Sequence, residues 1–251
     1  KQKIQYAYAI RNVKDGWTMD QRKVFFKFLR DAAQWSGGHS FAGFLKQIDA
    51  DAFANASDKE RLVIEATGMR KPFVVPPLPK PVGPGHDWTM DEVISLGKEK
   101  LKDRDFNNGK KMFSAARCVV CHRFGAEGGA TGPDLTQLAG RFVLKDLTES
   151  IIDPSKVIAQ QYQNTIYTVN GKTYVGRNIG ETTDKLIVAI DPEDSTKLAE
   201  LKKSEIEDSA PSPTSWMPAG LLKPLNESEV LDLMAYLLSR GNEKDAMFKK
   251  N

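Results

Sequence analysis

The sequence predicts a mainly α-helical protein that carries a small antiparallel β insertion and begins with an N-terminal helical region. Along most of the chain, apolar residues recur at helical spacing behind capping residues. A β-rich stretch at about residues 160–205 contains Asn170-Gly171, a strong signal for a two-residue hairpin. Of the 251 residues, 40% are hydrophobic and 27% are charged, which is ordinary for a globular protein. This length accommodates one large or two small domains.

Residues 1–70 are predicted to form the N-terminal helical region. Thr18 and Gln21 have the spacing of a capping box, and a second helix is expected over residues 41–53. Ser57 caps a third helix, which ends near Gly68. The apolar face expected for the first of these helices consists of Val24, Phe25, Phe28, Leu29 and Ala32.

Residues 71–87 are rich in proline and predict an extended linker, because proline has no amide hydrogen to donate within a helix. This is the best candidate for a domain boundary, which leaves residues 88–251 as the second domain. There, Trp88-Thr89-Met90-Asp91 repeats the tetrapeptide at residues 17–20 and is interpreted as a second, independent helix start.

The second domain is expected to place its β insertion between helices. One helix runs from about Phe106 and carries Gly109 and Phe113, and the last one starts at the Asn226 cap. The apolar face of that last helix consists of Val230, Leu233, Met234 and Leu237, with Tyr236 beside it. Strands are predicted at residues 162–169, 173–178, 185–190 and 198–202.

The run Cys118-Val119-Val120-Cys121-His122 is the most specific motif in the chain. A C-x-x-C-H run is the attachment signature of c-type haem, in which two thiols on one helical turn bind the vinyl groups. The histidine that follows then directs its imidazole at the iron. A zinc site would need a fourth ligand, and a dithiol redox site would need a βαβ context that this region lacks. These are the only two cysteines in the sequence, so the motif predicts one covalent haem c.

A second axial ligand would come from a methionine or from one of the two remaining histidines, His39 and His86. Met217 differs from the other methionines because it lies in a loop, and Pro218 after it keeps that loop out of a helix. Met234 belongs to an apolar helix face, and Met112 precedes Cys118 on the same helical segment. The remaining candidates are Met19, Met69, Met90 and Met247.

The order of these motifs resembles a class I cytochrome c. Residues 105–241 are more closely similar to the haem-binding domain of planctomycete and verrucomicrobial proteins. The pieces that carry this resemblance are residues 118–122, 132–136 and 150–155, the hairpin at Asn170-Gly171, and residues 215–221. The β insertion is the departure from a small cytochrome c, and it places Met217 nearly a hundred positions after Cys118.

The resemblance also implies a role for each matching residue. Cys118 and Cys121 would hold the haem, with His122 as the proximal ligand and Met217 as the distal ligand. Pro133 would accept a hydrogen bond from Nδ1 of His122 through its backbone carbonyl, which would orient the ring. Arg141 and Trp216 would contact the haem propionates or the haem edge.

These observations predict a monohaem electron-transfer module with histidine–methionine ligation. It would be an electron carrier, or the electron-transfer domain of a larger oxidoreductase, and not an enzyme by itself. The alternative is a haem enzyme or a gas-binding or sensing domain with an open sixth site. A third hypothesis makes the N-terminal helices a partner-binding module for the haem domain.

Partner and compartment follow from the same motif. Haem is attached to C-x-x-C-H motifs outside the bacterial cytoplasm, so we expect an exported precursor, a periplasmic location, and a periplasmic redox protein or dehydrogenase domain as partner. We expect the signal peptide of that precursor to have been removed from this sequence, and no apolar run approaches the length of a membrane span. The net charge is +3, with 14 Lys and Arg against 8 Asp and Glu in residues 1–80. We interpret this excess as solvated helix faces, with a basic docking face as the alternative, and no motif supports nucleic-acid binding.

Overall fold

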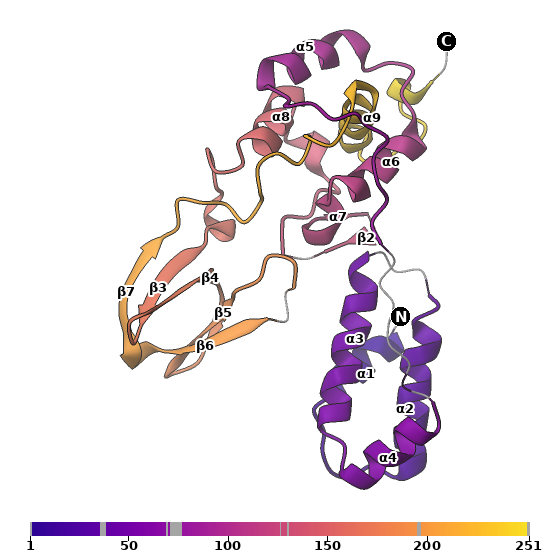
Figure 1. The fold of residues 1–251 in the computed structure, drawn as a ribbon, viewed down its shortest axis with the longest axis vertical. Coiled ribbons are helices and arrows are strands. Elements are labelled where there is room, and N and C mark those ends of the chain that lie inside the picture. The colour runs from indigo at the N-terminus through magenta and orange to yellow at the C-terminus, as the bar shows by residue number, and fades with distance from the viewer. Residues whose placement is uncertain are drawn as a thin grey trace. The chain divides into compact units, whose positions relative to one another are not determined.

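The computed structural model describes residues 2–35, 39–68, 70, 77–125, 127–129, 131–194 and 197–249, with residues 39 and 40 described by their backbone alone. The chain divides into two compact units, Lys1–Pro77 and Leu78–Asn251 (Figure 1). The helical unit has a hydrophobic core of its own, and so does the larger unit.

The regular secondary structure of the described residues in the first unit is entirely helical. The elements are α1 (Gln2–Ile10), α2 (Met19–Ala32), α3 (His39–Ala54) and α4 (Asp58–Ala66). Thr18 and Ser57 are N-caps, and each forms a complete capping box with the residue three positions later, as the sequence predicts. The core between these helices includes Phe26, Leu29, Leu45, Ile48 and Ile64.

The expected apolar face of α2 is wrong at one position, because Val24 is 67% exposed. The buried residues of α2 are Arg22, Phe25, Phe26, Leu29 and Ala32, a stripe with helical spacing that excludes position 24. Arg22 is fully buried in this stripe, and its Nε lies 2.9 Å from Oε1 of Glu60. A pattern of apolar residues could not identify this face completely, because one of its buried residues is the charged Arg22, which forms an ion pair with Glu60.

The second unit contains the remaining helices and both sheets. Its helical elements are α5 (Met90–Lys100), α6 (Phe106–Ala115), α7 (Cys118–Cys121), α8 (Leu144–Ile152) and α9 (Glu227–Leu238), with 3-10 turns η1 (Leu138–Gly140), η2 (Gln160–Tyr162), η3 (Lys203–Glu205) and η4 (Ala246–Phe248). Thr89 and Asn226 begin helices as N-caps, as predicted, and each forms a capping box. Of the helices in this unit, α8 has no counterpart among the predicted ones.

The proline-rich residues from Leu78 onward belong to this second unit. The carboxylate of buried Glu229 in α9 accepts hydrogen bonds from the amides of Val82 and Gly83, at 2.6 and 3.3 Å. The indole Nε1 of Trp88 donates to the carbonyl of Leu225 at 3.0 Å. This part of the predicted linker is therefore held against the start of α9.

The β insertion is a five-stranded antiparallel sheet with strand order β6-β5-β4-β3-β7. Its strands are β3 (Thr165–Val169), β4 (Lys172–Glu181), β5 (Lys185–Ala189), β6 (Leu198–Lys202) and β7 (Ile206–Pro211). The β3–β4 turn is at Asn170 and Gly171, both with positive φ, as the hairpin signal predicts. A separate two-stranded sheet pairs β1 (Arg123–Phe124) with β2 (Glu127–Gly128).

The sheet continues past residue 205, where the insertion was expected to end, because β7 pairs with β3. Most of β7 is exposed and polar, so it has no alternation of apolar residues by which the sequence could reveal it. In the second unit, β3 to β7 lie together on one side, away from α5, α6, α8 and α9 (Figure 1).

The helical part of the second unit is organised by the crossing of α6 and α9. A Cβ placed on Gly109 would lie 2.3 Å from the carbonyl oxygen of Asp232 and 2.8 Å from Cβ of Tyr236. The two helix backbones therefore touch at this glycine. Phe113 and Phe124 pack against the Tyr236 ring at centroid distances of 6.1 and 5.0 Å.

No helix in the described parts of the chain is both long enough and apolar enough to span a membrane.

We predict that Gly109→Ala destabilises the second unit by about 1–3 kcal/mol, because the added methyl group overpacks the crossing of α6 and α9. In an open helix the same change would instead stabilise by about 0.5–1 kcal/mol. Gly43→Ala in α3 is the matched control, since nothing lies within 4 Å of its Cβ position. Urea unfolding followed by circular dichroism measures both changes, and a Gly109→Ala protein as stable as the wild type would contradict the prediction.

Candidate functional site

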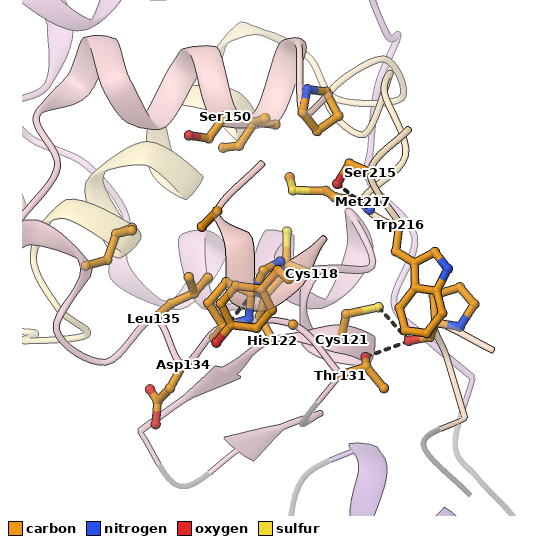
Figure 2. A pocket seen from close by; sticks show the side chains of 18 of the residues that line it. Cys118, Cys121, His122, Thr131, Asp134, Leu135, Ser150, Ser215, Trp216 and Met217 are labelled. Atoms are coloured by element: carbon orange, nitrogen blue, oxygen red, sulfur yellow. Dashed lines mark hydrogen bonds between the residues drawn. The ribbon is translucent and has the colours of Figure 1, made fainter. Parts of the chain in front are cut away.

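A cavity of about 750 Å³ lies in the second unit (Figure 2). It brings together every site residue that the sequence analysis selected, namely Cys118, Cys121, His122, Pro133, Arg141, Trp216 and Met217. Most of the remaining wall is apolar, and the segment between Leu135 and Ile158 contributes a large part of it. The cavity therefore combines thiol, imidazole and thioether groups with a hydrophobic lining.

The two thiols are presented by α7, a single helical turn that follows Arg117 in the left-handed conformation, at φ 64°. Cys118 is buried, and burial raises the pKa of its thiol to about 12. Cys121 is half-buried and its pKa is also raised, mainly by burial. Its Sγ donates to the carbonyl of Pro192, 3.2 Å away, which lies in the loop between β5 and β6.

The imidazole of His122 is oriented by one hydrogen bond, because Nδ1 lies 2.9 Å from the carbonyl oxygen of Pro133. A carbonyl can only accept, so Nδ1 carries the proton and the lone pair of the neutral ring is on Nε2. Burial lowers the pKa of His122, although the bond to Pro133 opposes this shift. The ring is therefore neutral at pH 7 and can donate through Nε2 to a metal.

Two glycines allow the chain to fold closely around this imidazole. A Cβ on Gly132 would lie 2.9 Å from both Cε1 and Nδ1 of His122. Gly128 has φ +106°, and a Cβ there would lie 2.0 Å from the His122 carbonyl oxygen. Side chains at either position would displace the ring or the backbone that carries it.

Met217 and His122 extend into the cavity from opposite sides (Figure 2). The loop of Met217 is fixed by hydrogen bonds, since its amide donates to Oγ of Ser215 at 3.1 Å. The Ser215 amide in turn donates to Oγ of Ser155, also at 3.1 Å. Among the methionines that the structure describes, Met217 alone lines the cavity.

The other methionine candidates have different positions. Met112 and Met234 are fully buried in the helical core, and Met69 lies outside the described residues. Met19 belongs to the first unit, where it begins α2, and Met90 begins α5. The carbonyl of Met247, near the C-terminus, accepts a hydrogen bond from the Arg104 amide.

Of the two alternative histidine ligands, His86 does not line this cavity. His86 is exposed, and its Nε2 lies 3.1 Å from Oε1 of Glu92. The side chain of His39 lies outside the described residues. In the described part of the chain, no group of three or more His, Cys, Asp and Glu side chains is placed to hold a metal ion, so the zinc hypothesis gains no support there.

Sequence reasoning missed the contributions of the β insertion to the cavity. Arg177 in β4 and Tyr162 in η2 line the wall, and Pro192 accepts from both Cys121 and Thr131. Arg117 forms an ion pair with Glu193 in the same loop. No local signal distinguishes these residues from ordinary strand and turn residues, because only the return of the sheet onto the C-x-x-C-H turn makes them part of the site.

Comparison with known families agrees with this geometry. The family model for cytochrome c matches residues 106–199. Residues 106–199 are thus similar to a cytochrome c domain. The match runs from α6 into β6 and includes the C-x-x-C-H turn, whereas the Met217 loop and α9 follow the matched residues. No curated protein matches the chain.

A cytochrome c domain indicates haem binding and electron transfer, and the cavity fits a haem c. Its volume lies within the range of about 300–1,000 Å³ that is usual for sites of this kind. Cys118 and Cys121 provide two thiols on one turn, and His122 provides a nitrogen lone pair. The matched family and the chemistry of the cavity are thus consistent with each other.

In protein prepared without haem, we predict that iodoacetamide alkylates Cys121 faster than Cys118 at pH 8. The thiolate is the reactive species, and the pKa of about 12 at Cys118 leaves almost none of it. Peptide mass spectrometry of the single variants Cys118→Ser and Cys121→Ser measures each rate. In denaturant the two rates should become equal, and equal rates in the folded protein would contradict the prediction.

Proposed function

We propose that this chain is a monohaem c-type cytochrome that acts as an electron-transfer module, with His122 and Met217 as the axial ligands. The observation that carries the proposal is the cavity itself, into which the neutral imidazole of His122 and the thioether of Met217 extend from opposite sides. Cys118 and Cys121 are the only cysteines, so they support attachment of a single haem.

Each residue of the cavity has a role in this proposal. Cys118 and Cys121 form the two thioether bonds, and Pro133 orients His122 by accepting its Nδ1 proton. Bound haem supplies an iron that changes its charge by one electron. The apolar wall around it excludes water, and a thioether ligand favours a higher reduction potential than a second histidine would.

Arg141 and Trp216 are proposed to contact the polar or exposed edge of the haem. Both line the cavity, and Arg141 is exposed to solvent. Within the described residues, the Arg141 guanidinium has no carboxylate partner in the protein. It is therefore available to an anionic propionate, whose geometry a guanidinium matches well.

The domain type, partner and compartment are also proposals. The hairpin at Asn170-Gly171 and the Met217-Pro218 loop support the planctomycete and verrucomicrobial type of haem-binding domain. Cytochrome c domains are typically extracytoplasmic, which supports a periplasmic location. A periplasmic redox protein, or a dehydrogenase domain, would then exchange electrons with the haem, and the N-terminal helices (1–70) remain a candidate partner-binding module.

The first test is Met217→Ala in the haem-loaded protein. Loss of the thioether should abolish the weak far-red sulfur-to-iron absorption band of the oxidised form and lower the reduction potential. It should also open the iron to carbon monoxide in the reduced form. Visible spectroscopy and potentiometric titration measure these changes.

Met234→Leu is the matched control, because it removes a methionine that is fully buried in the core. This near-isosteric change should cost less than about 1.5 kcal/mol and leave the spectrum unchanged. If Met217→Ala keeps the wild-type spectrum and potential, Met217 is not a ligand. Avid carbon monoxide binding by the wild type would instead favour the haem-enzyme or sensor alternative.

The covalent attachment has its own test. Cys118→Ser and Cys121→Ser should each retain haem through one thioether after denaturation, whereas the double variant should release all of it. Mass spectrometry of the denatured protein measures the attached haem, with the wild type expected to carry one. A wild-type protein that loses its haem under denaturing conditions would refute attachment at these cysteines.

A further inference from the structure

The side chain of Arg177 lies against two aromatic rings at the wall of the cavity. It projects from β4, and its Cζ lies 5.3 Å from the ring centroid of Tyr162 and 5.6 Å from that of Trp216. Arg177 is half-buried, and in the described part of the chain its guanidinium forms no ion pair. Both rings are within the distance at which a cation is attracted to an aromatic face.

Trp216 immediately precedes Met217, so a constraint on the indole also acts on the ligand loop. The start of this loop is set by the sheet, since Pro211 at the end of β7 is in register with Thr165 of β3. The Ser212 amide donates to the carbonyl of Asn164 at 2.8 Å. After this point the loop leaves the sheet, and Arg177 is a contact from β4 to the residue next to Met217.

We propose that Arg177 is a positioning residue, which holds Trp216 against the β insertion and thereby keeps Met217 directed into the cavity. The inference rests on the proposed ligation by Met217 and extends it to a role for the β insertion. In this arrangement the sheet holds the distal ligand Met217 in position through Trp216, while α7 and the following loop hold the proximal ligand His122.

A planar guanidinium suits this role better than an ammonium group does. Arginine stacks on aromatic faces, whereas lysine provides a compact and strongly hydrated charge. A purely electrostatic effect of Arg177 on the haem would be preserved by lysine. Stacking on Tyr162 and Trp216 would not be preserved, so the two explanations make different predictions.

The experiment uses the full haem-loaded chain with the variants Arg177→Lys and Arg177→Met. Imidazole is titrated into each oxidised protein, where it competes with Met217 for the iron, and the far-red sulfur-to-iron band is recorded. Both variants should bind imidazole about two- to thirty-fold more tightly than the wild type, the range that loss of such a contact gives. Both should also show a weaker far-red band.

Lys172→Met is the matched control, because it removes an exposed cation from the same strand and should match the wild type. Tyr162→Leu should shift imidazole affinity in the same direction as the Arg177 variants, while Tyr162→Phe keeps the ring and should not. If the Arg177 variants fail to fold, the two Tyr162 variants still test whether the aromatic contact affects Met217.

Three results would overturn the proposal. Wild-type imidazole affinity and far-red band in Arg177→Lys, with tighter imidazole binding in Arg177→Met, would show that only the charge matters. Wild-type behaviour of both Arg177 variants would show that the contact has no effect on Met217. A wild-type protein without the far-red band would refute Met217 ligation itself, and this failure of the proposed function is distinguishable from the other two.

Discussion

The hydrogen bond from Nδ1 of His122 to the Pro133 carbonyl is the interaction on which the site depends. It determines which nitrogen carries the proton, and so it leaves Nε2 as the donor toward the cavity. The bond can form only because the chain turns back closely around the ring, with Gly128 and Gly132 where side chains would collide with His122. Orientation and protonation of the imidazole are thus both properties of this short loop.

The crossing of α6 and α9 supports the C-x-x-C-H turn that precedes this loop. Gly109 brings the two backbones into contact, and the aromatic rings of Phe113, Phe124 and Tyr236 fill the space beside it. Because α6 leads directly into α7, this crossing positions the helical turn that carries the two cysteines. Near the start of α9, buried Glu229 also holds the proline-rich segment by hydrogen bonds. The same helix therefore contacts both α6 and this segment.

The β insertion brings together two parts of the site that are far apart in the sequence. Residues 118–122 and Met217 are separated by a long segment, and the cost of closing such a loop grows only slowly with its length. A sheet lowers this cost further, because β3 and β7 pair and bring both ends of the segment back together. Pro192 and Arg177 show that the insertion also contacts the site directly, at Cys121 and at Trp216.

The sequence by itself determined the features that depend on neighbouring residues. Capping boxes at Thr18, Ser57, Thr89 and Asn226, the Asn170-Gly171 hairpin and the C-x-x-C-H turn are local patterns, and the structure contains all of them. Tertiary structure decided what the local pattern could not: the burial of Arg22 with Glu60, the polar edge strand β7 and the contacts of Arg177. Each of these depends on residues brought together from distant parts of the chain, where packing and charge compensation override the preferences of the local sequence.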